Sequence, residues 1–277
     1  MARPEEAAQP ECIQGVVNYL NKDTEAPASY GGMSQKEADR KRRGKYESHT
    51  VTIHNARLLA AELSLEREGF VFVRHDTQMK DFYDQEELRS VYYKETEDLV
   101  KKTSGAKRVV VFDHTLRSGD EATREAKQVG GPVRGAHNDY TDWSGPQRVR
   151  DLLPDEAEEL LKGRFAVVQT WRPINRPVIR DPLAICDARS TGMEGAIPTA
   201  RIYPDRRGET LHYTFNPKHY WYYFPHMERH EAVVFKTFES EKDGRARWTL
   251  HSAFDDPDTP SDAPPRESIE MRTLAFF

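Results

Sequence analysis

Short segments rich in β-branched and aromatic residues recur along most of this chain of 277 residues, and they constrain the fold more than any other feature. Only two stretches favour helix: residues 83–104, with Gly105 at a C-cap position, and residues 154–163, which open with Pro154. Strands without regular intervening helices predict a mainly β (α+β) fold, a β-barrel or sandwich core with flanking helices. The expected strands are residues 51–54, 69–73, 108–112, 165–171, 182–186, 213–224, 232–238, 247–254 and 268–277.

The N-terminal part of the chain shows a different pattern. Residues 21–32 are loop-like, and residues 36–45 form a mostly basic run with few apolar positions. Such a run is typical of a solvated, mobile face, with a nuclear address or an anionic contact as the alternative. We therefore expect a flexible leader and loop over residues 1–48 and a single domain over residues 49–277, with a mobile loop at residues 118–131.

Charge, cysteine content and hydropathy limit the cellular setting. The net charge of −5 favours neither nucleic acid nor an anionic membrane as a partner. The two cysteines, Cys12 and Cys186, are few for this length and favour a reducing compartment. No apolar run approaches the ~18–20 residues of a membrane span, and the first residues lack the apolar core of a signal peptide. The sequence predicts a soluble cytoplasmic protein and leaves a homo-oligomer open.

A histidine and an aspartate two residues apart form the most informative motif, in the segment GAHNDY at 135–140. On a strand, residues i and i+2 point to the same face, so His137 and Asp139 could hold one metal ion together. His251 would complete two histidines and a carboxylate, the ligand set of non-haem Fe(II) oxygenases, which leaves positions open for co-substrate and O2. The third ligand is less settled, because the C-terminal half also contains His212, His219, His226 and His230.

An arginine downstream of His251 is a candidate for binding the carboxylate of a co-substrate. Arg266 follows His251 by fifteen residues, and Ser268 points the same way on an extended segment. A guanidinium forms paired, charge-assisted bonds to a carboxylate, which lysine cannot reproduce. Arg266 and Ser268 are therefore the expected anchor for the far carboxylate of 2-oxoglutarate, and Arg272 is the alternative.

Three further residues are weaker candidates. Arg117 and Arg172 stand at expected strand ends and could contact the co-substrate or a carboxylate of the substrate. A salt bridge to a nearby aspartate explains either arginine equally well. For His114, a packed or hydrogen-bonded structural role is favoured over a ligand role.

A family resemblance rests on several segments that stand in order along the chain. They are VFDHTLR at 111–117, AHNDY at 136–140, WRPI at 171–174, PLAICDARS at 182–190, YTFNPKHYWYY at 213–223, HSAFDDP at 251–257 and PPRESIEMR at 264–272. With these segments the chain resembles the AsaB-like hydroxylase/desaturase family, which includes fungal gibberellin desaturases and a protein of bacterial cephamycin methoxylation. The resemblance implies a double-stranded β-helix (jelly-roll, cupin-like) core that binds Fe(II) and 2-oxoglutarate, often in secondary-metabolite oxidation.

Three functional hypotheses follow. The first is an Fe(II)/2-oxoglutarate-dependent dioxygenase that uses O2 to hydroxylate or desaturate a small organic metabolite. The second is a non-catalytic jelly-roll subunit or metabolite binder, for which an intact set of metal ligands would be unnecessary. The third is a metal-dependent hydrolase or isomerase, because the same three ligands could hold zinc with a water in the fourth position.

Overall fold

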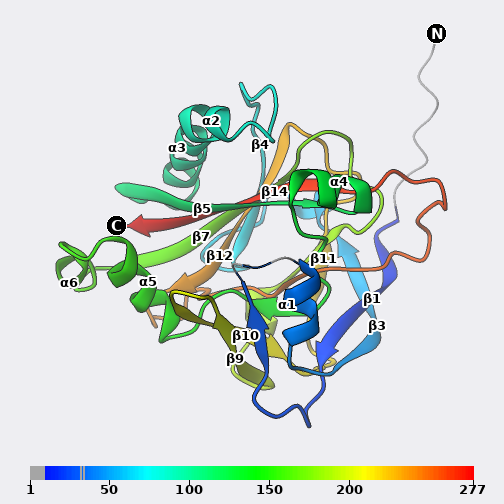
Figure 1. The fold of residues 1–277 in the computed structure, drawn as a ribbon, viewed down its shortest axis with the longest axis horizontal. Coiled ribbons are helices and arrows are strands. Elements are labelled where there is room, and N and C mark those ends of the chain that lie inside the picture. The colour runs from blue at the N-terminus through cyan, green and yellow to red at the C-terminus, as the bar shows by residue number, and fades with distance from the viewer. Residues whose placement is uncertain (1–9, 32, 34) are drawn as a thin grey trace.

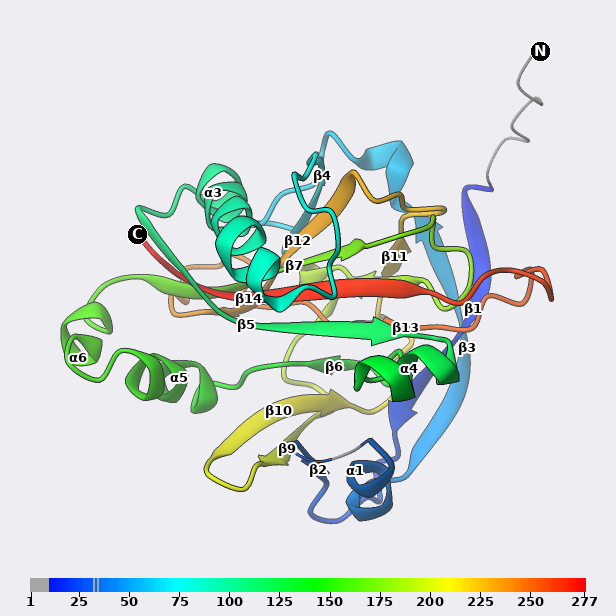
Figure 2. The ribbon, with the colours of Figure 1, turned by 45° about the horizontal axis from the view of Figure 1, so that its top comes forward.

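Two antiparallel-rich β-sheets form the core of the protein (Figures 1 and 2). The computed structural model describes residues 10–31, 33 and 35–277. The larger sheet has the order β1 (Cys12–Leu20), β3 (Tyr46–Asn55), β11 (Trp221–Tyr223), β8 (Leu183–Cys186), β13 (His251–Ala253), β6 (His137–Asn138), β10 (Arg207–Tyr213), β9 (Ala196–Ile202) and β2 (Ala28–Tyr30). The smaller sheet has the order β4 (Phe70–Arg74), β12 (Glu231–Glu239), β7 (Phe165–Pro173), β14 (Glu267–Phe276) and β5 (Arg108–Ser118).

The two sheets pack against each other through an apolar layer. One cluster of buried side chains joins Phe70, Trp171 and Phe235 of the smaller sheet to Ile185 and Tyr222 of the larger sheet. Strand β7, in the middle of the smaller sheet, is buried at all nine positions, which explains the apolar run at its beginning, residues 165–168. This pair of curled sheets confirms the predicted mainly β fold with a jelly-roll core.

Helices cover the outside of the sheets. The elements α2 (Gln85–Glu87), the π-helical η2 (Leu88–Tyr92) and α3 (Tyr93–Ser104) follow one another, and α3 packs on the outer face of the smaller sheet (Figure 2). Gly105 ends α3 with a φ of +76°, a left-handed conformation that glycine adopts without a steric penalty. The predicted helix over residues 83–104 and its glycine cap are confirmed. The remaining helical elements are α1 (Gln35–Lys41), η1 (Ala56–Leu59), α4 (Glu121–Lys127), α5 (Ser144–Leu152), α6 (Ala157–Leu160) and η3 (Ala188–Ser190).

The N-terminal segment belongs to the larger sheet. Strand β1 pairs with β3 along its whole length, and the side chains of Val17 and Tyr19 are fully buried. The prediction of a flexible leader was therefore wrong for residues 10–48 as far as the structure describes them, and residues 1–9 lie outside the described residues. Ile13, Val17 and Tyr19 share one parity, so their burial follows the two-residue period of a strand.

Other predicted elements differ in extent. Residues 121–127 form α4 within the expected mobile loop, because the Asp120 side chain caps the helix by accepting from the backbone N–H of Thr123 at 2.7 Å. The β9–β10 hairpin and α5 were not predicted. The expected strands at 213–224 and 247–254 shorten to β11 and β13, and the helix expected at 154–163 shortens to α6.

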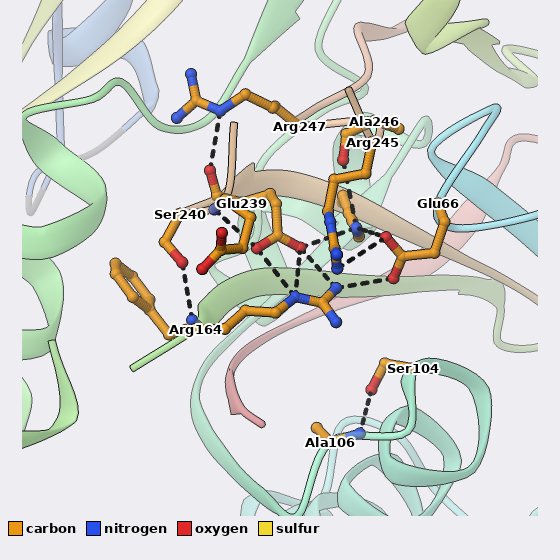
Figure 3. A network of polar contacts seen from close by, with 12 residues as sticks. Glu66, Ser104, Ala106, Arg164, Glu239, Ser240, Arg245, Ala246 and Arg247 are labelled. Carbon is orange, nitrogen blue, oxygen red and sulfur yellow. Dashed lines mark hydrogen bonds and ion pairs between the residues drawn. The ribbon is translucent and has the colours of Figure 1, made fainter. Parts of the chain in front are cut away.

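A salt-bridge cluster of Glu66, Arg164, Lys236 and Glu239 lies at one end of the smaller sheet (Figure 3). The Lys236 ammonium is 0% exposed and donates to Glu66 and Glu239 at 2.9 Å each and to the Ala246 carbonyl at 3.3 Å. Arg164 Nη2 donates to both glutamates at 2.8 Å. Every charge of the cluster therefore has an opposite charge within hydrogen-bond distance.

Two findings bear on the cellular setting. Both cysteines are free thiols, Cys12 exposed and Cys186 buried. Across the described residues, no helix is both long and apolar enough to cross a bilayer.

Candidate metal and co-substrate site

A cavity of about 420 Å³ opens between the two sheets, and its lining brings together residues that are far apart in the sequence. The larger sheet contributes His137 and His251, and Asp139 follows β6 directly. The smaller sheet contributes Trp171 from β7, and Arg266 immediately precedes β14. The cavity is thus enclosed by the inner faces of both sheets.

Strand register places the three predicted metal ligands side by side. His251 of β13 is paired directly with His137 of β6, and their ring centroids are 4.3 Å apart. Asp139, two residues beyond His137, points to the same side, and its Oδ1 lies 3.6 Å from His137 Nε2. One ligand atom from each of the three residues lies within 4.8 Å of the others. Within the described part of the chain, these residues could hold one metal ion.

Both imidazoles are held in the neutral form that binds metals. His137 Nδ1 donates to the Gly135 carbonyl at 2.7 Å, which leaves Nε2 free to face Asp139. Burial lowers the pKa of His137 below its usual value. Burial, and then the neighbouring His137, lower the pKa of His251 to about 3. Each ring therefore keeps a lone pair available at neutral pH.

Asp139 is held as a carboxylate by neighbours on the smaller sheet. Its Oδ2 accepts from Gln169 Nε2 at 2.8 Å and from Arg272 Nε at 3.1 Å. Burial alone would raise the pKa of Asp139, but the charge of Arg272, together with the hydrogen bond from Gln169, holds it well below its usual range. Because Oδ2 is occupied by these donors, Oδ1 is the oxygen that faces His137. Sequence reasoning missed Gln169, whose only signal was its polar character within a buried strand.

The contacts of Arg272 show that this arginine is not available for a ligand. Arg272 already contacts three carboxylates: Asp139, Asp113 at 3.2 Å, and Glu270. It also donates to Thr115 Oγ1 at 2.8 Å. Its charge is therefore compensated by the protein itself, and its geometric role is to orient Asp139.

Arg266 lies on the same side of the chain but has no carboxylate partner among the described residues. Its Nη1 donates to the backbone carbonyl of Asp181 at 2.6 Å, and its guanidinium lies 5.4 Å from the Trp171 ring centroid. Its Nε and the neighbouring Ser268 Oγ are buried and have no hydrogen-bond partner in the described structure. Burial, followed by repulsion from Arg117, lowers the pKa of Arg266 to about 9. These groups together can receive an anion.

The two weaker arginine candidates differ in location: Arg117 lines the cavity, and Arg172 does not. Arg117 is paired with Ser268, lines the cavity, and donates from Nη1 to the Gly131 carbonyl at 3.0 Å. Arg172 follows Trp171 and so projects from the opposite face of β7, where it hydrogen-bonds the His75 carbonyl and faces the Tyr92 ring. Arg172 does not line the cavity, and nothing in its surroundings supports a role in binding the co-substrate.

The other histidines have different environments. His114 is bonded through Nδ1 to the Tyr93 hydroxyl at 2.9 Å, and His219 through Nδ1 to the Tyr19 hydroxyl at 3.1 Å. His212 is paired with His137 in the sheet and lines the cavity, but its Nδ1 is already bonded to the Tyr46 hydroxyl at 2.9 Å. His226 and His230 lie outside the lining.

The residues present fit a ferrous ion with a chelating 2-oxo acid. Two neutral imidazoles and a carboxylate on one side of the ion match the ligand preference of non-haem Fe(II) and leave the cavity side open. Arg266 lines the same cavity, and its unpartnered Nε, with the unpartnered Ser268 Oγ two residues further on, matches the second carboxylate of such an acid.

Comparisons with known proteins agree with this geometry. A family model described as "Oxidoreductase/YMDC permease-like domain" matches residues 17–276. The hydroxylase/desaturase efuI of Hormonema carpetanum is 32% identical over 257 residues, which cover 85% of this chain and 86% of the relative. The chain belongs to the hydroxylase/desaturase family of Fe(II)/2-oxoglutarate-dependent oxygenases.

Another member of this family has a solved structure. The Fe(II)/2-oxoglutarate-dependent dioxygenase nvfI of Aspergillus novofumigatus is 30% identical over 235 residues, which cover 82% of this chain and 83% of the relative. A structure of the iron and alpha-ketoglutarate-dependent endoperoxidase NvfI superposes with a TM-score of 0.82 at 25% identity, covering 96% of this chain and 98% of the other. Family membership confirms the predicted fold, the oxidoreductase class and the predicted use of Fe(II), 2-oxoglutarate and O2.

Proposed function

We propose that His137, Asp139 and His251 hold the catalytic iron of this oxygenase, and that Arg266 and Ser268 hold the far carboxylate of 2-oxoglutarate. The observation that carries the proposal is the contrast between the two arginines of the cavity wall. Arg272 is bonded to three carboxylates, whereas the buried Arg266 has only a backbone carbonyl as its partner among the described residues. A second carboxylate from the co-substrate would give Arg266 the charged partner that no described residue provides.

The bound groups and the protein have separate tasks. Fe(II), 2-oxoglutarate and O2 supply the oxidation of a C–H bond, coupled to conversion of 2-oxoglutarate to succinate and CO2. The protein orients the ligands: the Gly135 carbonyl fixes the tautomer of His137, and Gln169 and Arg272 fix the rotamer of Asp139. The enclosing sheets keep bulk water from this end of the cavity. Arg117, also on the wall, is placed to contact the co-substrate or the substrate.

The substrate in this proposal is a small organic metabolite of secondary metabolism, which the enzyme hydroxylates or desaturates. The names of the relatives efuI and nvfI support the reaction class, and the cavity of about 420 Å³ supports a small-molecule substrate. We place the enzyme in the cytoplasm without a nucleic-acid or membrane partner, which the two free thiols and the net charge of −5 support. A homo-oligomer remains open.

Anaerobic titration tests the proposal. The protein with Fe(II) should develop a metal-to-ligand charge-transfer absorption band when 2-oxoglutarate is added, and succinate should form after exposure to air. Absence of both the band and succinate would reject the proposal. Turnover without O2 or 2-oxoglutarate would instead support a metal-dependent hydrolase or isomerase, and absence of turnover without a copurifying protein would support a non-catalytic subunit.

A further inference from the structure

The outer half of the cavity carries a surplus of positive charge. Eight arginines but only five carboxylates line the whole cavity, although the chain as a whole has a net charge of −5. Arg117, Arg266 and Arg272 belong to the inner end described above. The outer arginines are Arg42, Arg148, Arg201, Arg206 and Arg207.

No described carboxylate is paired with this surplus of positive charge. None of the outer arginines forms an ion pair with any described carboxylate. The carboxylates of this region are engaged elsewhere: Glu209 accepts from the Thr141 hydroxyl at 2.7 Å, and Asp151 accepts from Gln147 Nε2 at 2.7 Å. A concave wall of one sign concentrates ligands of the opposite sign.

Two of these arginines converge on one small space in the β9–β10 hairpin. The guanidinium groups of Arg201 and Arg206 lie 5.3 Å and 3.7 Å from the centroid of the Tyr203 ring, and both side chains are half-buried. Arg201 is paired with Gly208 across the hairpin. A Cβ placed on Gly208 would lie 3.6 Å from Arg201 Cβ and 3.7 Å from Arg206 Nη1. The absence of a side chain at Gly208 therefore leaves room beside both arginines.

The same hairpin connects this space to the metal ligands. Gly208, Thr210 and His212 share one parity along β10 and all line the cavity, and the His212 ring stacks on His137 with centroids 5.6 Å apart. His212 is four positions further along the strand than Gly208, which corresponds to about 13 Å. A molecule of moderate length can thus reach from the arginine pair to the metal ligands.

We propose that Arg201 and Arg206 bind an anionic group of the substrate, a carboxylate or a phosphate, at the outer end of the cavity. The inference rests on the proposed function, because it takes the inner end of the cavity to be the iron and 2-oxoglutarate site. The substrate class is an organic acid whose oxidised carbon and anionic group are separated by about the 13 Å between Gly208 and His212 along β10. Planar guanidinium groups suit this role because each can donate two parallel hydrogen bonds to a carboxylate or a phosphate.

Calorimetric titration of the protein loaded with Mn(II) and saturating 2-oxoglutarate tests this inference without turnover. The probes share one ring system: 1-naphthaleneacetate, its methyl ester and 1-naphthyl phosphate. We expect at least one anion to bind about tenfold or more tightly than the ester, since two charge-assisted contacts are lost in the ester. The tighter of the two anions identifies the group as carboxylate or phosphate.

The double variant Arg201→Gln/Arg206→Gln should reduce this anion preference at least tenfold. The matched control is Arg176→Gln, which removes an exposed charge outside the cavity and should retain the preference. Equal affinity of wild-type protein for ester and anions, or an unchanged preference in the double variant, overturns the inference. Failure of Mn(II) and 2-oxoglutarate to bind overturns the proposed function and, with it, this inference.

Discussion

Two groups of buried charges in this protein differ in how completely they are paired. In the salt-bridge cluster, Lys236 is 0% exposed and donates to two glutamates and a carbonyl. In the cavity, Arg266 is 4% exposed, yet it donates only to a backbone carbonyl and keeps an unpartnered Nε. Burial of a charge without a partner is costly, so its persistence in a cavity wall indicates a ligand that supplies the partner. Arg172 Nε is also buried without a partner in the described structure, but Arg172 does not line the cavity, whereas Arg266 does. An unpaired charge indicates a ligand site here because it faces a cavity, and the paired charges of the cluster hold the fold together.

The largest effect is expected at the iron site. Asp139→Ala removes the only carboxylate among the three proposed metal ligands and leaves the Arg272 charge beside the proposed metal position. We expect loss of tight Fe(II) binding and a fall in succinate formation of about a thousandfold or more. The control is Asp113→Asn, which also removes a partner of Arg272 but no metal ligand. Equal iron binding by Asp139→Ala and wild type would contradict the assignment.

A substitution in the salt-bridge cluster should lower the stability of the protein and leave its activity unchanged. Lys236→Met leaves the Glu239 charge buried with fewer partners, and we expect a loss of about 3–5 kcal/mol in the free energy of unfolding. Urea denaturation measures this loss, and activity per folded molecule should persist. Lys162→Met breaks an exposed salt bridge to Glu159, so it should change stability by about 1 kcal/mol or less. Similar losses of unfolding free energy in Lys236→Met and Lys162→Met would show that burial does not make the cluster contribute more to stability than an exposed salt bridge does.

A substitution of Arg266 should instead weaken co-substrate binding and leave stability unchanged. Arg266→Gln is expected to weaken 2-oxoglutarate binding about a hundredfold, because two charge-assisted hydrogen bonds are lost. Stability should not fall, since the substitution removes a buried cation without a carboxylate partner. Arg266→Lys should restore part of the affinity as a point charge. Titration of 2-oxoglutarate under anaerobic conditions measures the affinity, and an unchanged value in Arg266→Gln would refute the anchor.

The smallest expected effect is in the pH dependence of stability. Burial raises the pKa of Glu239, but the hydrogen bond from Arg164 and the charge of Lys236 lower it by more than burial raises it. The pKa of Glu239 therefore lies below the usual 4.5. Near pH 4.5 the unfolded chain therefore binds more protons at this position than the folded protein does. The contribution of Glu239 to stability is complete above that pH and is lost as the pH falls through the pKa of the folded state.

In Glu239→Gln the free energy of unfolding should therefore fall less steeply as the pH drops below about 4.5. The slope should decrease by up to about 1.4 kcal/mol per pH unit, which corresponds to one proton. Glu125→Gln, on the exposed side of α4, is the control that removes the same charge outside the cluster. Identical slopes below pH 4.5 in Glu239→Gln and wild type would contradict the role of pairing in the cluster.

Local patterns in the sequence predicted one part of the site, and tertiary contacts determined the rest. His137 and Asp139 are two residues apart, so the period of a strand was enough to place them on one side. The pairing of His251 with His137 depends on sheet register over more than a hundred residues, and the sequence alone left several histidines open. The availability of Arg266, in contrast to Arg272, depends on which carboxylates lie nearby in space.

The same distinction applies to the fold. The strands of the smaller sheet were predicted because burial on both faces gives them apolar runs rich in β-branched and aromatic residues, such as residues 165–168 of β7. Strands β9 and β10 were missed because this half-exposed hairpin is rich in polar residues. Strand β1 was missed although its buried residues alternate. The glycine and polar residues between Ile13 and Tyr19 interrupt the apolar pattern in the sequence.

The most direct measurement is an anaerobic crystal structure of the protein with Fe(II) and 2-oxoglutarate. We predict that His137 Nε2, Asp139 and His251 coordinate the iron and that the far carboxylate of 2-oxoglutarate is bonded to Arg266 and Ser268. A far carboxylate bonded to Arg272, with Asp139 displaced from that arginine, or a metal bound elsewhere would contradict this account.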